Sequence, residues 1–343
     1  MSTELPLPPY FDSAKVAQVW RVPYQERAQQ ATEWRREYSV MPASKDKFRV
    51  SLMLVDVQNT FCIPDFELFV AGKSGNGAVE DNSRLCAFIY KSLPWITQIC
   101  PTMDTHQAMQ IFHSIFLVDR KGKHPPPATL VSVQDIRDGK WLFNHELCDA
   151  LDVDKKYGQR FLQHYVTQLH EHGKYELTIW PYHAMLGGIG HALVSSVEEA
   201  IFFHSVTRYS QPDYQIKGNN PLTENYSVVS PEVVQDQEGN SIAYRNTSFV
   251  QKLLRFDAVV IAGQAKSHCV AFTIDDLLKQ IKTADVRLAR RVYLLEDCMS
   301  PVVIPGVVDY TEVAAAAFER FADAGMNIVR STTPMCEWPG IQI

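Results

Sequence analysis

The chain has 343 residues, and 33 Lys+Arg against 39 Asp+Glu give it a net charge of −6. Its length alone predicts roughly two domains, and 46% hydrophobic with 21% charged residues is typical of a folded globular protein rather than a disordered one. This mildly acidic balance argues against nucleic acid and anionic membrane surfaces as partners, because both attract basic proteins.

Seven cysteines are scattered along the sequence without a C-x-x-C pair. Such spacing is not that of a disulfide scaffold or of a thiolate zinc site, and it favours a reducing compartment. The segment Met1 to Pro9 lacks the basic and apolar regions of a signal peptide, and no apolar run has the roughly 18 residues of a membrane span. We therefore expect a cytoplasmic protein.

Residues 1–47 are charged and of mixed composition, and a helix is predicted within them over Tyr24 to Tyr38. A short apolar run from Val50 to Asp56 then predicts a strand buried on both faces, as in a parallel sheet. Similar runs recur at residues 256–263, 291–296 and 327–330.

Between these runs, apolar residues recur at the spacing of one face of a helix. Apolar residues three and four apart predict a helix over Val270 to Ile281. A second helix is predicted to open with a capping box at Asp309 and to end before Gly325 at the C′ position. Alternating strands and helices indicate an α/β fold with a mostly parallel sheet. Two polar stretches, 117–176 and 228–247, interrupt the pattern and are interpreted as insertions.

Polar residues that follow the strands are the candidates for chemistry, because ligands bind at the carboxyl ends of parallel strands. Asp56 ends the first strand, where it could be a base or simply a cap for the loop. Cys269 stands at a helix N-terminus, where the dipole and free N–H groups lower a thiol pKa and stabilise an oxyanion. The alternative for Cys269 is a small buried apolar residue. Lys217 alone is uninformative, because most lysines are solvated.

A second group of candidates could bind a metal ion. Asp104 and His106 are two residues apart, His113 follows, and His183 ends a Trp-Pro-Tyr-His segment. Two imidazoles and a carboxylate from separate loops suit a divalent ion with open coordination positions. Because the spacing matches no standard zinc motif, solvated histidines remain the alternative.

Taken in order, these segments resemble the isochorismatase-like cysteine hydrolases, and among them most closely the nicotinamidases. The segments that carry the resemblance are Asp56 to Phe61, Asp104 to His106, His113 to Phe116, Trp180 to His183, Lys217–Gly218 with Tyr226–Ser227, and Gly263 to Val270.

The resemblance spans residues 48–335 and implies a three-layer α/β/α fold with a six-stranded, mostly parallel sheet. It revises the expected two domains to one hydrolase domain over 48–335, with insertions near 117–176 and 228–247. Residues 1–47 become an N-terminal extension and residues 336–343 a C-terminal tail. Members are commonly oligomeric, so a homo-oligomer is expected.

The activity implied by the resemblance is hydrolysis of a small amide to an acid and ammonia through a Cys269 thioester. Asp56 would take the thiol proton, and Lys217 would hold charge beside it. Backbone N–H groups of Ala265 and Cys269 would form the oxyanion hole, with a cis peptide before Ala265.

The resemblance also assigns a cofactor and a ring-binding pair. Asp104, His106 and His183 match the family's ligands for a divalent metal ion, with zinc as the first choice and iron or manganese as alternatives. The ion would bind the pyridine nitrogen of nicotinamide. Phe61 and Trp180 match the aromatic residues that sandwich the ring.

Two other functions stay open at this stage, because Tyr226 to Val229 and the first insertion depart from the family pattern. One is a metal-free relative that hydrolyses a ureido, carbamoyl or maleamate-type amide. Such substrates usually carry a carboxylate and need an arginine or a backbone nest. The other is a non-catalytic scaffold that uses residues 1–47 and the insertions for binding.

Overall fold

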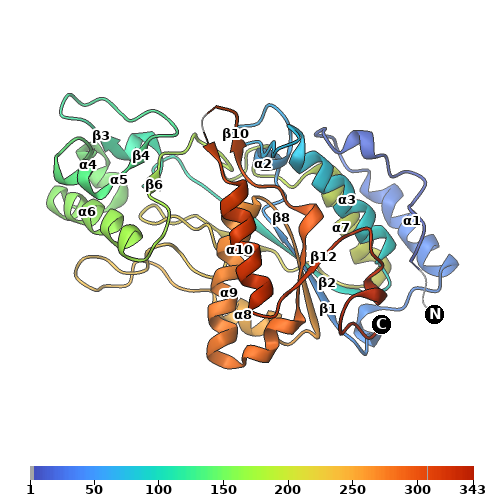
Figure 1. The fold of residues 1–343 in the computed structure, drawn as a ribbon. Coiled ribbons are helices and arrows are strands. Elements are labelled where there is room, and N and C mark those ends of the chain that lie inside the picture. Colours follow the sequence, from blue (N-terminus) through green and yellow to red (C-terminus); the bar gives the residue numbers. More distant parts are fainter. Residues whose placement is uncertain (1–3, 307) are drawn as a thin grey trace.

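The computed structural model describes residues 4–306 and 308–343, and it has a central sheet of six parallel strands in the order β12-β9-β8-β1-β2-β7 (Figure 1). The strands are β1 (Val50–Val55), β2 (Ile96–Asp104), β7 (Gln215–Lys217), β8 (Ala258–Gly263), β9 (Val292–Leu295) and β12 (Asn327–Val329). The predicted α/β class and six-stranded sheet are therefore confirmed.

The central strand β1 shows why the sheet forms. All of its side chains are buried, and successive residues point to opposite faces. Val50, Leu52 and Leu54 join one hydrophobic core, whereas Met53 and Val55 join the other. A continuous apolar run is therefore required, because both faces of this strand are covered.

Helices cover the two faces of the sheet (Figure 1). On one side lie α3 (Gly77–Lys91) and α7 (Ser195–Arg208), with α1 (Tyr24–Glu37) packed on α7. On the other side lie α8 (Thr247–Leu253), α9 (Ala271–Ala284) and α10 (Thr311–Asp323). The helices predicted from sequence at the positions of α1, α9 and α10 are present.

The predicted capping box of α10 is wrong. The N-cap of α10 is Tyr310, which makes no side-chain cap. Asp309 lies one residue earlier and accepts a hydrogen bond from the Thr311 N–H at 2.8 Å, so the aspartate forms a local turn rather than a reciprocal cap. The predicted end is correct, since Gly325 follows the C-cap with a φ of +97°.

Residues 117–176, the stretch predicted to be the first insertion, contribute most of a third hydrophobic cluster, and this part of the chain extends to the left in Figure 1. Its elements are α4 (Val133–Arg137), α5 (Cys148–Leu151) and α6 (Lys155–Glu171), with the antiparallel pairs β3 (Leu117–Val118)–β5 (Leu142–Phe143) and β4 (Leu130–Val131)–β6 (Leu177–Thr178). Helix α6 contributes Phe161, Tyr165 and Leu169 to this cluster at spacings of four. Because residues 117–176 contain many polar residues, this row of apolar side chains on α6 was not predicted from the sequence.

Three shorter features complete the chain. The helical turn α2 (Asn59–Cys62) follows β1, and β10 (Val303–Ile304) pairs with β11 (Val308–Asp309). Residues 228–247 are irregular apart from the isolated bridge between Gln235 and Ser241 and the first residue of α8. Within the part of the chain that the structure describes, no helix is both long and apolar enough to cross a membrane.

The order of the strands creates the place for a site. From β1 the sheet grows in one direction through β2 and β7, and in the other through β8, β9 and β12. The order in which strands are added to the sheet therefore reverses between β1 and β8, although these two strands are parallel. Crevices at such reversals, beyond the carboxyl ends of the strands, are where open α/β sheets bind ligands.

Candidate active site

Four side chains from four strand ends meet at this edge of the sheet. Asp56 directly follows β1, Asp104 ends β2 and Lys217 ends β7, while Cys269 lies in the helical turn after β8. Asp104 and Lys217 are direct partners in the sheet register. Parallel alignment therefore brings residues up to 213 positions apart in the sequence to one point.

Lys217 contacts the other three side chains of this group. Its Nζ lies 2.9 Å from Asp56 Oδ2 and 2.9 Å from Asp104 Oδ1, and it donates to the Asn225 carbonyl at 2.8 Å. The same Nζ lies 3.6 Å from Cys269 Sγ. Its side chain is 2% exposed. A buried ammonium is costly unless paired, and the two carboxylates hold the pKa of Lys217 well above its usual range.

The Cys269 thiol is buried and lies close to the Asp56 carboxylate. Burial raises the pKa of Cys269 well above its usual value, and Asp56 and Asp104 raise it further against the opposing charge of Lys217. The lowered thiol pKa predicted from the helix N-terminus is therefore wrong, because two nearby carboxylates and loss of solvent outweigh the dipole. The resting cysteine is a thiol that needs a base.

Asp56 is placed to be that base. Its carboxylate has no exposure to solvent, and Thr102 Oγ1 donates to its Oδ1 at 2.5 Å. Burial raises the Asp56 pKa, whereas Lys217 and Thr102 oppose that rise. A raised pKa makes the Asp56 carboxylate a stronger base toward the thiol proton, whereas the raised pKa of Cys269 means that its thiol does not ionise without such a base. Thr102 was not found from the sequence, since a threonine in a strand carries no signal of its own.

The turn after β8 has a fixed backbone. Gly263 has a φ of +119°, and a Cβ there would lie 2.1 Å from the Val55 carbonyl oxygen, so only glycine fits. The Gln264–Ala265 peptide is cis, as the resemblance implied. The Gln264 side chain donates to Asp81 at 2.9 Å and accepts from the Ser300 N–H at 3.2 Å. Ala265 and Cys269, both in or next to this turn, line the cavity described below.

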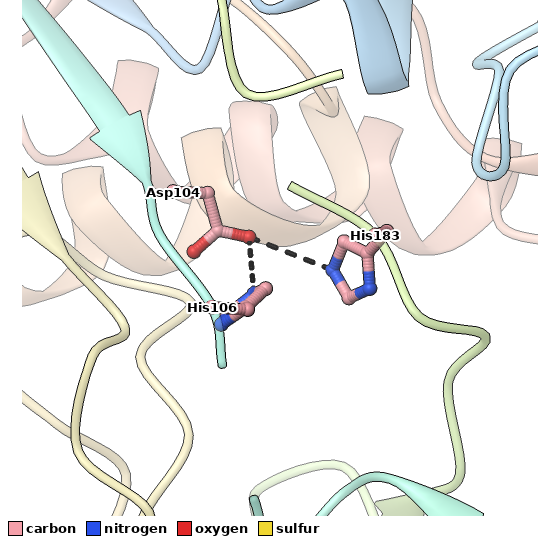
Figure 2. Close-up of side chains that lie close together, drawn as sticks. All are labelled: Asp104, His106 and His183. Carbon is pink, nitrogen blue, oxygen red and sulfur yellow. Dashed lines mark hydrogen bonds and ion pairs between the residues drawn. The ribbon is translucent and has the colours of Figure 1, made fainter. Parts of the chain in front are cut away.

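Asp104, His106 and His183 form a buried group in which one ligand atom from each lies within 4.8 Å of the others (Figure 2). His106 Nε2 lies 2.8 Å and His183 Nε2 lies 3.6 Å from the same oxygen, Asp104 Oδ2. Gln58 fixes Asp104 by bonding both its N–H and its carbonyl at 2.8 Å. Asp104 therefore joins two clusters, because its other oxygen faces Lys217.

The donor set fits a divalent metal ion. His106 Nδ1 lies 3.1 Å from the Gly218 carbonyl and His183 Nδ1 lies 2.8 Å from the Pro181 carbonyl. A carbonyl accepts only from N–H, so each Nε2 is left with a lone pair directed at the shared site. Asp, His and His are ligand types that zinc and similar ions prefer.

His113 lies beside this group without belonging to it. Its ring centroid is 6.1 Å from that of His106 and 6.2 Å from that of His183. Its Nδ1 bonds the Ala108 carbonyl at 3.1 Å, while its buried Nε2 has no hydrogen-bond partner among the described residues. Burial and the two neighbouring imidazoles lower the His113 pKa to about 3, so the ring is neutral.

A cavity of about 300 Å³ opens onto both clusters. Phe61, Trp180, Ala265, Cys269 and His183 line it, which brings the predicted ring-binding, oxyanion, nucleophile and metal residues to one space. Its remaining lining residues are Phe66, Glu67, Leu68, Phe69, Val70, Asp104, Glu224, Asn225, Tyr226, His268, Val302 and Ile304. Members of all four predicted sets therefore line one cavity, although they are far apart in the sequence.

No protein-family model matches the chain, and no curated protein matches it. Among solved structures, the chain is similar to the yeast nicotinamidase, at 19% identity and a TM-score of 0.49, over 82% of this chain and 99% of that one. It is similar to a pyrazinamidase of Pyrococcus horikoshii in complex with zinc, at 18% identity and a TM-score of 0.41, over 82% and 98% of the chains. It is also similar to an N-carbamoylsarcosine amidase from Thermoplasma acidophilum, at 14% identity and a TM-score of 0.42, over 84% and 99% of the chains.

These neighbours are named as a nicotinamidase, a pyrazinamidase and an N-carbamoylsarcosine amidase. They include both an enzyme for an aromatic amide and one for a carbamoyl compound. At these identities and TM-scores the likeness does not choose between the two substrate classes. The reaction therefore has to be inferred from the site itself.

Proposed function

We propose that this protein is a cysteine-dependent amidohydrolase that converts a small aromatic amide such as nicotinamide into its acid and ammonia. One observation carries the proposal: Cys269 lines the cavity, and the ammonium of Lys217 lies 3.6 Å from its sulfur and 2.9 Å from the carboxylate of Asp56. A buried ion pair beside a nucleophile is expensive to keep without a use. This arrangement favours an enzyme over a scaffold.

In the first half of the proposed reaction, Asp56 takes the proton of the Cys269 thiol as the sulfur attacks the amide carbon. The buried thiol is protonated at rest, so attack and proton transfer occur together. Lys217, within 3.6 Å of the sulfur and 2.9 Å of Asp56, stabilises negative charge on whichever of the two carries it. Backbone N–H groups of Ala265 and Cys269 would stabilise the oxyanion.

In the second half, Asp56 gives the proton to the leaving nitrogen, the C–N bond of the tetrahedral adduct breaks, and ammonia departs to leave a thioester on Cys269. Asp56 then accepts a proton from water as the water oxygen attacks the thioester carbon. The acid leaves and the thiol regains its proton. The overall change is amide plus water to acid plus ammonia.

Asp104, His106 and His183 would hold the divalent ion, for which zinc is the first choice and iron or manganese are alternatives. When bound, the ion supplies a Lewis-acid position for a ring nitrogen of the substrate. Phe61 and Trp180 would pack on the faces of the ring, where flat apolar contact favours an aromatic amide.

The charge of the cavity supports an amide without a carboxylate over the ureido or maleamate type. The acidic residues in its lining are Glu67, Asp104 and Glu224, and the described lining contains no lysine or arginine. Burial lowers the pKa of His268 to about 3, so this lining residue is neutral as well. A substrate carboxylate would therefore face like charges without the arginine that such substrates need.

The test is release of ammonia from nicotinamide by the zinc-loaded full chain. We expect turnover that is abolished in Cys269→Ala and retained in Cys86→Ala, a buried cysteine of α3 remote from the site. Chelation should remove activity and added zinc restore it. Failure to hydrolyse any small amide, or activity in Cys269→Ala, would overturn the proposal.

We further expect a homo-oligomer in the cytoplasm, where the seven free thiols would stay reduced.

A further inference from the structure

A buried carboxyl group on the cavity wall has no role in the proposed reaction. Glu224 is 7% exposed and lines the cavity beside Trp180 and Tyr226. Its backbone is held firmly: its N–H donates to the Tyr165 hydroxyl at 3.1 Å, and its carbonyl accepts from the Glu232 N–H at 2.9 Å. The backbone of Glu224 is therefore fixed relative to the pocket.

The Glu224 carboxyl has unused hydrogen-bonding capacity. The Tyr226 hydroxyl lies near it, and Trp180 Nε1 donates to the Tyr226 oxygen at 3.2 Å. A carboxyl group can accept about four hydrogen bonds, yet no other side chain of residues 4–306 or 308–343 donates to this one. A buried polar group left short of partners costs free energy, which a ligand donor would recover.

The surroundings select the kind of ligand group that fits there. Glu232 and Asp104 add negative potential at Glu224, and Lys217 opposes it. Burial raises the pKa of the Glu224 carboxyl, but both the ionised and the neutral carboxyl keep an accepting oxygen. A neutral or cationic N–H group is favoured at this wall, whereas a carboxylate or an apolar group is not.

We infer that Glu224 is a specificity-determining residue that accepts a hydrogen bond from an N–H group on the substrate ring. The cavity then selects aromatic amides that carry an amino or protonated amine substituent at the position facing Glu224. This inference rests on the proposed amidohydrolase function and names its substrate class more narrowly.

The experiment uses matched nicotinamides with an amino or a methyl group at each free ring position. Binding constants are measured calorimetrically on the zinc-loaded Cys269→Ala chain, which cannot turn the amides over, and kcat/KM is measured on the wild type. At one ring position the amino compound should bind at least about tenfold more tightly than the methyl compound. In Cys269→Ala/Glu224→Leu that ratio should fall below about threefold.

A second variant guards against a folding defect in Glu224→Leu. Glu224→Gln keeps the shape of the side chain and an accepting oxygen, so the preference for the amino over the methyl compound should be retained in this variant. The inference is overturned if no position shows a preference, if the preference persists in Glu224→Leu, or if it is lost in Glu67→Gln instead. Binding selectivity without turnover would refute the proposed reaction alone, whereas turnover without selectivity would refute this inference alone.

Discussion

Replacing Lys217 by methionine tests the contacts that its ammonium makes in the site most directly. Methionine keeps the length of the side chain and removes the ammonium that contacts Asp56 and Asp104, each at 2.9 Å. At an effective dielectric constant of about 20, each contact is worth about 6 kcal/mol of attraction before desolvation. Removing one partner of a buried ionic cluster costs about 3–5 kcal/mol net, because the remaining charges lose their compensation.

The same substitution should change catalysis in a defined direction. Lys217 lowers the pKa of Asp56 against burial, so without it the carboxyl holds its proton to higher pH and is a poorer base at pH 7. We expect kcat/KM for nicotinamide to fall about 10²–10⁴-fold at neutral pH, with the acid limb of the pH profile moved to higher pH. Steady-state ammonia release across pH and urea unfolding measure the two effects.

A matched control and a double variant decide whether the reasoning holds. Lys266→Met removes a half-buried lysine that lies 4.2 Å from the centre of the Phe318 ring, and it should leave the pH profile unchanged. Adding Asp104→Asn to Lys217→Met should recover about 1–3 kcal/mol of stability relative to additive losses. A folded Lys217→Met protein with kcat/KM within threefold of the wild type at pH 7 would refute the assigned role.

Three further predictions concern other parts of the structure. Tyr226→Phe removes the hydroxyl that accepts from Trp180, so KM for nicotinamide should rise about threefold to tenfold while kcat changes little; an equal fall in kcat in steady-state assays would contradict this. Gly218→Ala places a Cβ 2.8 Å from Asp104 Oδ1 at a φ of +84°, so zinc titration should show at least about tenfold weaker binding, and wild-type affinity would argue against the ligand set. Burial lowers the pKa of His204 in the folded protein to about 4, whereas its pKa in the unfolded chain is about 6.5. The folded state is therefore fully stable with respect to this group above pH 6.5, and the free energy of unfolding falls as the pH drops from about 6.5 toward 4. Between those pH values the wild type should lose about 3 kcal/mol more stability than His204→Gln, whereas parallel unfolding curves would exclude the effect.

Local sequence patterns determined much of the scaffold. The run from Val50 to Val55 is apolar at every position but Ser51, and a strand buried on both faces is the structure that such a run forms. The helical period after Cys269 likewise predicted α9. Since candidate residues come directly after these runs, the rule that parallel strands end at one edge already placed Asp56 and Cys269 near each other.

Other features depend on residues distant in the chain, and only the tertiary structure decided them. Lys217 ends a strand of three residues, which is too short to show a periodic pattern. Its role depends on its contacts with two carboxylates, Asp56 directly after β1 and Asp104 at the end of β2. The raised pKa of Cys269 has the same origin, because solvent exclusion and long-range charges exceed the local helix dipole. Glu224 gave no signal in the sequence, since an acidic residue in a loop is ordinarily solvated. Sequence periodicity records which side chains are buried, whereas the charges that meet inside the fold are set by strand order, and strand order is a property of the folded chain.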